Sequence, residues 1–167
     1  VRQISEMKVD VPMLAMTHCD AAKLSKQGKN SEYALCASQW HKTLSYKDKY
    51  FGSGKKYDKD FTKEFGYAPP YQAAESSAAL LVYKDAFERA NSFDTKKVRD
   101  ALAATDMQTF YGNIKFAPGG QNVSKPMVLF QVICNKDGSS CENKVVAPTK
   151  WASAKLIHPV PSWSKRK

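Results

Sequence analysis

The 167-residue sequence predicts a mixed α/β fold. Stretches with the two-residue period of strands alternate along the chain with stretches that have the 3.6-residue period of helices. Hydrophobic residues make up 43% and charged residues 25% of the chain, which is the balance of a globular protein and excludes wholesale disorder. The longest apolar run, residues 127–134, is interrupted by Gln131 and is too short for a membrane span.

The N-terminal part is expected to form a strand, a turn and a helix, followed by a second strand. Residues 12–16 have the composition of a short buried strand, residues 17–20 form the turn, and residues 21–28 form the helix. Asp20 precedes this helix, where its carboxylate would accept hydrogen bonds from free backbone N–H groups. The next strand is expected at residues 33–37.

The middle of the chain is expected to be helical. Aromatic residues spaced four apart predict a helix over residues 55–65, which ends at Gly66. Two prolines then open a longer helix over residues 71–91, because proline lacks the N–H group that is unpaired in a first turn anyway. The small residues 73–79 let another element approach this helix closely, and Asp94 is expected to cap a further helix.

The last third is expected to return to strands. Residues 109–112 and 114–116 have the pattern of short strands, and a Pro-Gly-Gly turn at residues 118–120 follows them. Two strand-like runs, residues 127–133 and 145–147, then predict a hairpin.

The four cysteines bear on the compartment. A hairpin would bring Cys134 and Cys141 within disulfide distance, and Cys19 and Cys36 are then left as a possible second pair. Disulfides persist where thiols are oxidised, so the bridged chain would be extracytoplasmic. Four free thiols are the alternative, and they would require a cytosolic protein.

The charge balance suits an anionic partner. The chain has 26 Lys and Arg against 16 Asp and Glu, a net charge of +10. The basic end, residues 164–167, either binds anions or is a free solvated terminus. Basic and aromatic residues also mix over residues 40–67, as in proteins that bind single-stranded nucleic acid, but these aromatic residues have the spacing of a core. No nucleic-acid partner is therefore expected.

No motif for catalysis, metal or phosphate binding is found. His18 and Cys19 are adjacent on an extended segment and point to opposite sides, so they cannot pair as base and nucleophile. Cys134 and Cys141 are separated by six residues rather than by the two to four of a zinc-binding pair, and there is no second ligand pair. Glycine-rich phosphate-binding motifs are missing. The chain is expected to be no enzyme, with no metal and no cofactor.

A series of short segments carries a family resemblance by its order and spacing. The segments are residues 39–40 (QW), 46–48 (YKD), 50–52 (YFG), 65–75 (FGYAPPYQAAE), 94–102 (DTKKVRDAL), 109–112 (TFYG), 114–116 (IKF), 120–122 (GQN) and 125–127 (KPM). From about residue 12 to residue 163, the chain resembles the C-terminal half of substrate-binding proteins of branched-chain amino-acid ABC transporters, which are type I periplasmic binding proteins like the leucine/isoleucine/valine-binding proteins.

This resemblance implies an incomplete three-layer α/β fold of the periplasmic-binding-protein type, with parts of two lobes. Residues 1–38 would belong to lobe 2 and residues 39–112 to the helical part of lobe 1. Residues 113–167 would return through the hinge to lobe 2, with the C-terminal hairpin and the basic tail. The implied function is that of a periplasmic or otherwise extracytoplasmic component that closes on an amino acid or a related small carboxylate and delivers it to a membrane permease. A missing N-terminal half would be its chain partner.

The expected ligand contacts are Thr17, His18 and Trp40. In open α/β sheets ligands collect beyond the C-terminal ends of strands, and Thr17 and His18 follow such an end. These residues could instead only shape the turn. Trp40 lies near the expected hinge and would either cover the cleft or belong to the core. The alternative function is a partial binding-protein domain repurposed as a structural or interaction subunit of a larger assembly.

Overall fold

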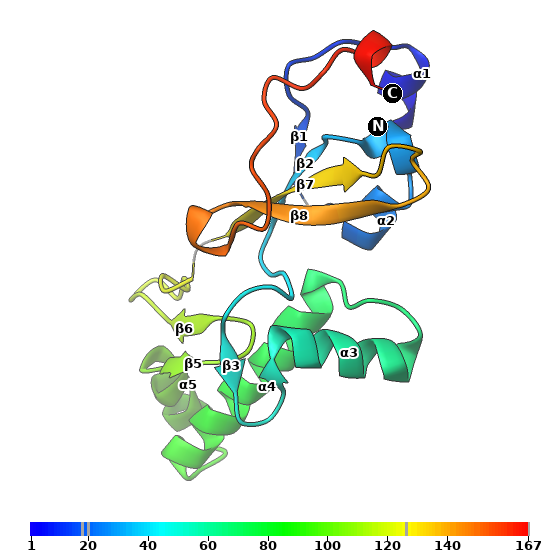
Figure 1. Ribbon diagram of the computed structural model, residues 1–167. Coiled ribbons are helices and arrows are strands. Elements are labelled where there is room, and N and C mark those ends of the chain that lie inside the picture. The colour runs from blue at the N-terminus through cyan, green and yellow to red at the C-terminus, as the bar shows by residue number, and fades with distance from the viewer. Residues whose placement is uncertain (18, 20, 126, 167) are drawn as a thin grey trace. The chain divides into compact units, whose positions relative to one another are not determined.

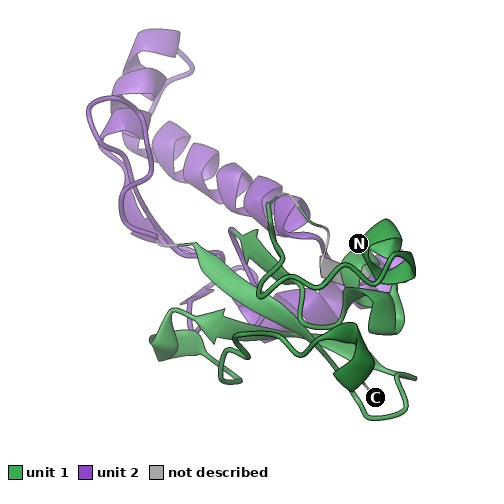
Figure 2. Ribbon diagram, turned by 90° about the horizontal axis from the view of Figure 1, so that it is seen from above, with its two compact units in different colours: residues 1–38, 127–167 green, residues 39–126 purple. Residues whose placement is uncertain are grey.

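A computed structural model of the chain describes residues 1–17, 19, 21–125 and 127–166 and shows two compact units (Figures 1 and 2). Unit 1 comprises residues 1–38 and 127–167, and unit 2 comprises residues 39–126. The chain therefore passes between the units twice.

Unit 1 is built on a four-stranded sheet with the order β1-β2-β7-β8. The strands are β1 (Ala15–Met16), β2 (Leu35–Ser38), β7 (Val128–Cys134) and β8 (Cys141–Ala147). β1 runs parallel to β2, whereas β7 runs antiparallel to both β2 and β8. The predicted hairpin is confirmed, but its second strand starts at Cys141 rather than at residue 145, because the ladder continues to the Cys134–Cys141 pair.

The helices of unit 1 are short. They are α1 (Arg2–Glu6), α2 (Ala21–Ser25) and the 3-10 helices η1 (Gly28–Ser31), η2 (Thr149–Trp151) and η3 (Trp163–Lys165). The predicted helix over residues 21–28 ends early, and Gly28 instead begins η1 with a φ of 58°, a left-handed conformation that suits glycine. The strand predicted over residues 12–16 is reduced to its last two residues.

The core of unit 1 lies against its sheet. One cluster of buried residues consists of Leu24, Ala34, Cys36, Phe130 and Val132. Gln131 is also fully buried, with its side-chain amide donating to the backbone oxygens of Tyr33 and Ile157 and accepting from the N–H of Ile157 at 3.0 Å. These bonds satisfy the buried amide and tie the C-terminal segment to β7.

The C-terminal end packs on the N-terminal segment. For Arg166, the prediction of a free solvated terminus is therefore wrong. The backbone N–H of Trp163 donates to the Asp10 carboxylate at 2.9 Å, and its indole N–H donates to the backbone oxygen of Val9 at 3.0 Å. The guanidinium of Arg166 lies 3.8 Å from the centroid of the Trp163 ring. Both ends of the chain accordingly lie at the same end of unit 1 (Figure 1).

Unit 2 contains the long helices. They are α3 (Gly54–Phe65), α4 (Tyr71–Ala90) and α5 (Thr95–Ala103). Their ends follow the predicted chemistry: α3 stops at Gly66, which has a left-handed φ of 76°, and the Asp94 side chain accepts a hydrogen bond from the N–H of Lys97 at the start of α5.

Two small antiparallel sheets complete unit 2. They pair β3 (Lys47–Asp48) with β4 (Gly52–Ser53), and β5 (Asp106–Gln108) with β6 (Asn113–Lys115). The strand predicted at residues 109–112 is wrong: these residues form the turn between β5 and β6, with mutual backbone hydrogen bonds between Thr109 and Gly112. Unit 2 extends to residue 126, beyond the lobe boundary expected after residue 112, and β6 pairs with β5 inside it.

Candidate functional site

The corner that follows β1 is held by a disulfide. Thr17 directly follows the strand and is exposed. Cys19, two residues on, is bonded to Cys36 of β2, with 6.2 Å between the Cα atoms. The bridge therefore fixes the chain after β1 to the neighbouring strand. His18, the second expected contact, and Asp20, the expected helix cap, lie outside the described residues.

The disulfide predicted at the end of the hairpin is also present. Cys134 and Cys141 are bonded across the end of the hairpin, with 4.0 Å between their Cα atoms. In the part of the chain that the structure describes, no group of His, Cys, Asp and Glu side chains could hold a metal ion. Nor is any helix of the described residues long and apolar enough to cross a membrane.

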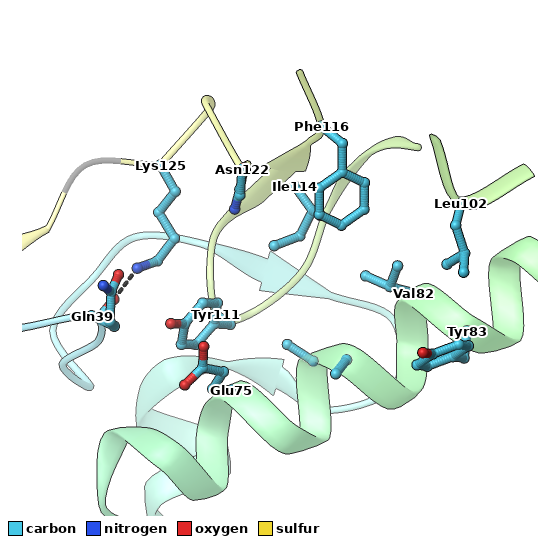
Figure 3. A pocket seen from close by; sticks show the side chains of 12 residues that line it. Gln39, Glu75, Val82, Tyr83, Leu102, Tyr111, Ile114, Phe116, Asn122 and Lys125 are labelled. Carbon is cyan, nitrogen blue, oxygen red and sulfur yellow. Dashed lines mark hydrogen bonds between the residues drawn. The ribbon is translucent and has the colours of Figure 1, made fainter. Parts of the chain in front are cut away.

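The two connections between the units start side by side in unit 1. β2 ends at Ser38 and β7 begins at Val128, and these two residues are paired in the sheet. In unit 2 the segments next to the two connections are also joined, because the Lys125 ammonium donates a hydrogen bond to the backbone oxygen of Gln39 (Figure 3). Each unit thus holds the two connecting segments together at its own end.

Lys125 lies in a confined environment. Its ammonium is 4.2 Å from the centroid of the Tyr111 ring, which is cation–π distance. A Cβ atom at Gly112 would approach Lys125 Cε to 2.7 Å, so glycine leaves room for the lysine chain. Burial lowers the pKa of Lys125 to about 8, although the charge of Glu75 acts against this shift. Burial also raises the pKa of Tyr111, and Glu75 and Tyr71 add to that rise.

Lys125 marks one end of a pocket in unit 2 with a volume of about 490 Å³. The polar residues that line it are Gln39, Glu75, Tyr111, Asn122 and Lys125, and the apolar side chains farther along it include Val82, Leu102, Ile114 and Phe116 (Figure 3). The Asn122 side chain accepts from the N–H of Lys115 and donates to the backbone oxygen of Asn113. Several of the polar groups are thus engaged in contacts within unit 2, and the other end of the pocket is apolar.

Trp40 belongs to an aromatic cluster. Its side chain is 5% exposed and makes edge contacts with Tyr57 and Phe110, with centroid distances of 5.8 and 6.1 Å. Phe110 is fully buried and stacks on Tyr57 at 4.2 Å. Trp40 does not line the pocket described above. Of the two roles expected for Trp40, its burial favours the core role.

The contacts of Lys125 could not be anticipated from the sequence. Gln39 and Lys125 are 86 residues apart, and neither residue belongs to a recognisable binding motif. The segments that contain Gly112 and Lys125 do belong to the family-like series, but their order along the chain does not reveal that they meet.

The chain is similar to a known protein family and to several solved structures. A family model described as periplasmic binding protein matches residues 1–139. The leucine-binding protein LivK from Thermotoga maritima is similar over 89% of this chain and 41% of its own, with a TM-score of 0.68 and 24% identity. LivJ from Streptococcus pneumoniae, solved with isoleucine, is similar over 86% of this chain and 40% of its own, with a TM-score of 0.64 and 15% identity.

A third similar structure is an ABC transporter substrate-binding protein from Desulfitobacterium hafniense, solved with Leu. It covers 84% of this chain and 37% of its own, with a TM-score of 0.60 and 20% identity. All three are named as leucine-binding or substrate-binding proteins. The chain spans less than half the length of each of them.

Proposed function

Because this chain belongs to the periplasmic binding protein family, we propose that it forms part of the extracytoplasmic solute-binding component of an ABC importer, with an amino acid or a related small carboxylate as ligand. The observation that carries the proposal is the family match over residues 1–139. The fold shared with proteins that are named for leucine and branched-chain amino-acid binding supports this ligand class.

The double connection between the units supports a two-lobed binding protein. Both connections leave unit 1 from the paired residues Ser38 and Val128. Hinges of binding proteins that close around a ligand are a few residues in such short connections. In this proposal the two units belong to different lobes, and the membrane permease and the rest of the binding protein are the partners.

Thr17 and His18 are the ligand contacts of this proposal. They follow β1, where a hydroxyl and an imidazole could bind the carboxylate or ammonium group of an amino acid. The Cys19–Cys36 disulfide supports this role because it fixes the corner in place before the ligand arrives. Trp40 packs in the aromatic cluster at the start of unit 2 and is not a ligand contact in this proposal.

Titration calorimetry with leucine, isoleucine and glutamate tests the proposal. We expect the 167-residue chain alone to bind no more tightly than about 1 mM, since a cleft with one wall largely missing does not enclose the ligand. The full polypeptide encoded by the gene is expected to bind one of these amino acids about a thousandfold more tightly. No binding to the full polypeptide by these or other small carboxylates would overturn the proposal.

A matched pair of variants tests the site itself. In the full polypeptide, Thr17→Ala should weaken amino-acid binding about tenfold, because a lost hydrogen bond to a charged group costs about 1.5 kcal/mol or more. Thr62→Ala changes an exposed threonine of α3 and should leave the affinity unchanged. Equal affinities of both variants and the parent would remove Thr17 from the site.

The second candidate function is that of a structural or interaction subunit that has lost ligand binding. It is favoured by the large apolar side chains that α4 exposes. A complete native protein of 167 residues that binds no small carboxylate but assembles with a larger partner would support it over the importer component.

A further inference from the structure

Helix α4 exposes an apolar face. Leu80, Tyr83 and Phe87 are spaced three and four residues apart, so they share one side of the helix. Their exposed fractions are 66%, 50% and 36%, and Phe93, which is 89% exposed, lies 5.4 Å from Phe87 between ring centroids. These four residues are called the α4 outer face below. Such a cluster of large exposed side chains marks an interaction site in a soluble protein.

The opposite side of α4 is apolar as well. The residues buried there are Ala74, Ala78, Leu81, Val82 and Ala86. Four of the five charged residues of the helix pair with one another, Lys84 with Glu88 and Asp85 with Arg89. A helix that is apolar on two sides is typical of an element packed between two layers. The described residues supply a layer on one side of α4 only.

The α4 outer face continues into the pocket of unit 2. Tyr83 belongs to both, and Ala79 beside it also lines the pocket. From there the apolar surface runs to Leu102 of α5 and to Phe116 after β6 (Figure 3). The small side chain of Ala79, which is exposed, would let the backbone of another layer come close to α4.

We propose that the α4 outer face and the apolar end of the pocket are the docking surface for the rest of the same binding protein. The occupant is the polypeptide that makes up more than half of the relatives' length and has no counterpart in this chain. In α/β proteins an apolar helix face packs on a sheet, and the occupant is expected to offer one. This inference rests on the proposed function.

The charge of the chain argues against a second copy as the occupant. Two copies would bring like net charges of +10 together, which opposes association. The remaining part of the binding protein need not carry the same net charge, so this repulsion does not apply to it. Its covalent linkage to this chain would also give it a high effective concentration at the α4 outer face.

Thiol labelling of the full polypeptide tests the docking surface. All four cysteines of this chain are in disulfides, so Tyr83→Cys adds one reactive thiol. We expect a maleimide to modify residue 83 rapidly in the 167-residue chain. In the full polypeptide the reaction should be slower by more than about tenfold, because it then needs local opening. The control Lys59→Cys, on the exposed surface of α3, should react alike in both forms.

Phe93→Cys provides a second probe where a change cannot disturb the core, since this side chain is 89% exposed. Equal labelling of residues 83 and 93 in both forms would overturn the proposal. A gene product of only 167 residues with both thiols reactive would overturn it too, as would a dimer of this chain, seen by sedimentation, that protects residue 83. Protection in a full polypeptide that binds no amino acid would support the docking surface while refuting the proposed function.

Discussion

The two units of the chain are stabilised by different means. Unit 1 has a four-stranded sheet and both disulfides, Cys19–Cys36 and Cys134–Cys141. Unit 2 has no cysteine, and its core is an aromatic cluster around Phe110 together with the small residues of α4. Unit 1 is cross-linked by covalent bonds, whereas unit 2 depends on packing and leaves the α4 outer face uncovered among the described residues.

Removal of the disulfides should have the largest effect and should separate the units. The bridges span 17 and 7 residues, and on the loop-entropy estimate they contribute about 3 and about 2.5 kcal/mol. Replacement of all four cysteines by alanine should therefore bring unit 1 close to unfolding. Hydrogen exchange of separate peptides should show lost protection in β2, β7 and β8, with α3 and α5 unchanged.

The same experiment tests whether the two units are stabilised independently of each other. If α3 and α5 lose protection together with the sheet, the two units fold as one cooperative body. A double variant that lacks only the Cys134–Cys141 bridge serves as the graded control, and it should lose about half as much stability.

Phe110→Ala should have the next largest effect, in unit 2. Phe110 is fully buried and contacts the rings of Trp40, Phe51 and Tyr57, so its truncation should cost about 3–5 kcal/mol. Denaturant unfolding followed by Trp40 fluorescence measures the loss. The control Phe65→Ala, at a side chain that is 57% exposed, should cost far less. Equal losses for the two variants would show that the aromatic cluster does not stabilise unit 2.

The sequence predicted what short-range chemistry decides. The ends of α3 and α5 follow from Gly66 and Asp94, because a left-handed glycine and a capping carboxylate act on adjacent residues. The turn at residues 109–112 was missed because Thr109 Oγ1 accepts from the N–H groups of Tyr111 and Gly112 and competes with a strand. Judged only by the alternation of its residue types, the segment 109–112 resembles a strand.

The candidate site was less predictable than the fold. The Cys134–Cys141 bridge followed from a local hairpin, and the pairing of Cys19 with Cys36 followed by exclusion. The contact of Lys125 with Gln39 depends on the course of the whole of unit 2, so no local pattern signals it. The role of Thr17 as a ligand contact stays a prediction.

The free energy of unfolding should rise with pH because of Lys125. Its pKa is about 8 in the folded chain, against about 10.4 for an unfolded lysine. Between these values the unfolded chain binds more protons, so the folded chain gains stability as pH increases. From pH 7.5 to pH 10 we expect a gain of about 1–3 kcal/mol relative to Lys125→Met, measured by urea unfolding of both proteins.

Tyr111 sets the upper limit of this experiment. Its pKa is raised in the folded chain, so above about pH 10 the unfolded chain loses protons first and stability falls again. Tyr111→Phe should reduce that fall and keep the rise below pH 10. Parallel pH curves for the parent protein and Lys125→Met would show that the lysine is well solvated and does not hold the two connections together.

Arg166 should give the smallest effect, in unit 1. The guanidinium lies 3.8 Å from the Trp163 ring centroid and donates to the backbone oxygen of Pro161 at 2.9 Å. A cation–π contact near the surface contributes about 0.5–1 kcal/mol, so Arg166→Gln should lower the free energy of unfolding by about that amount. Lys165→Gln, at the exposed neighbouring position, removes the same charge and is the matched control.

The two variants distinguish a packed end from a solvated one. If the terminus docks as described, only Arg166→Gln should speed hydrogen exchange at Trp163, whose N–H is bonded to Asp10. If the terminus is merely basic and solvated, the two variants should have equal and negligible effects. That result would show that the contact between the ends of the chain does not stabilise unit 1. The two units would then differ only in the sheet and the disulfides of unit 1.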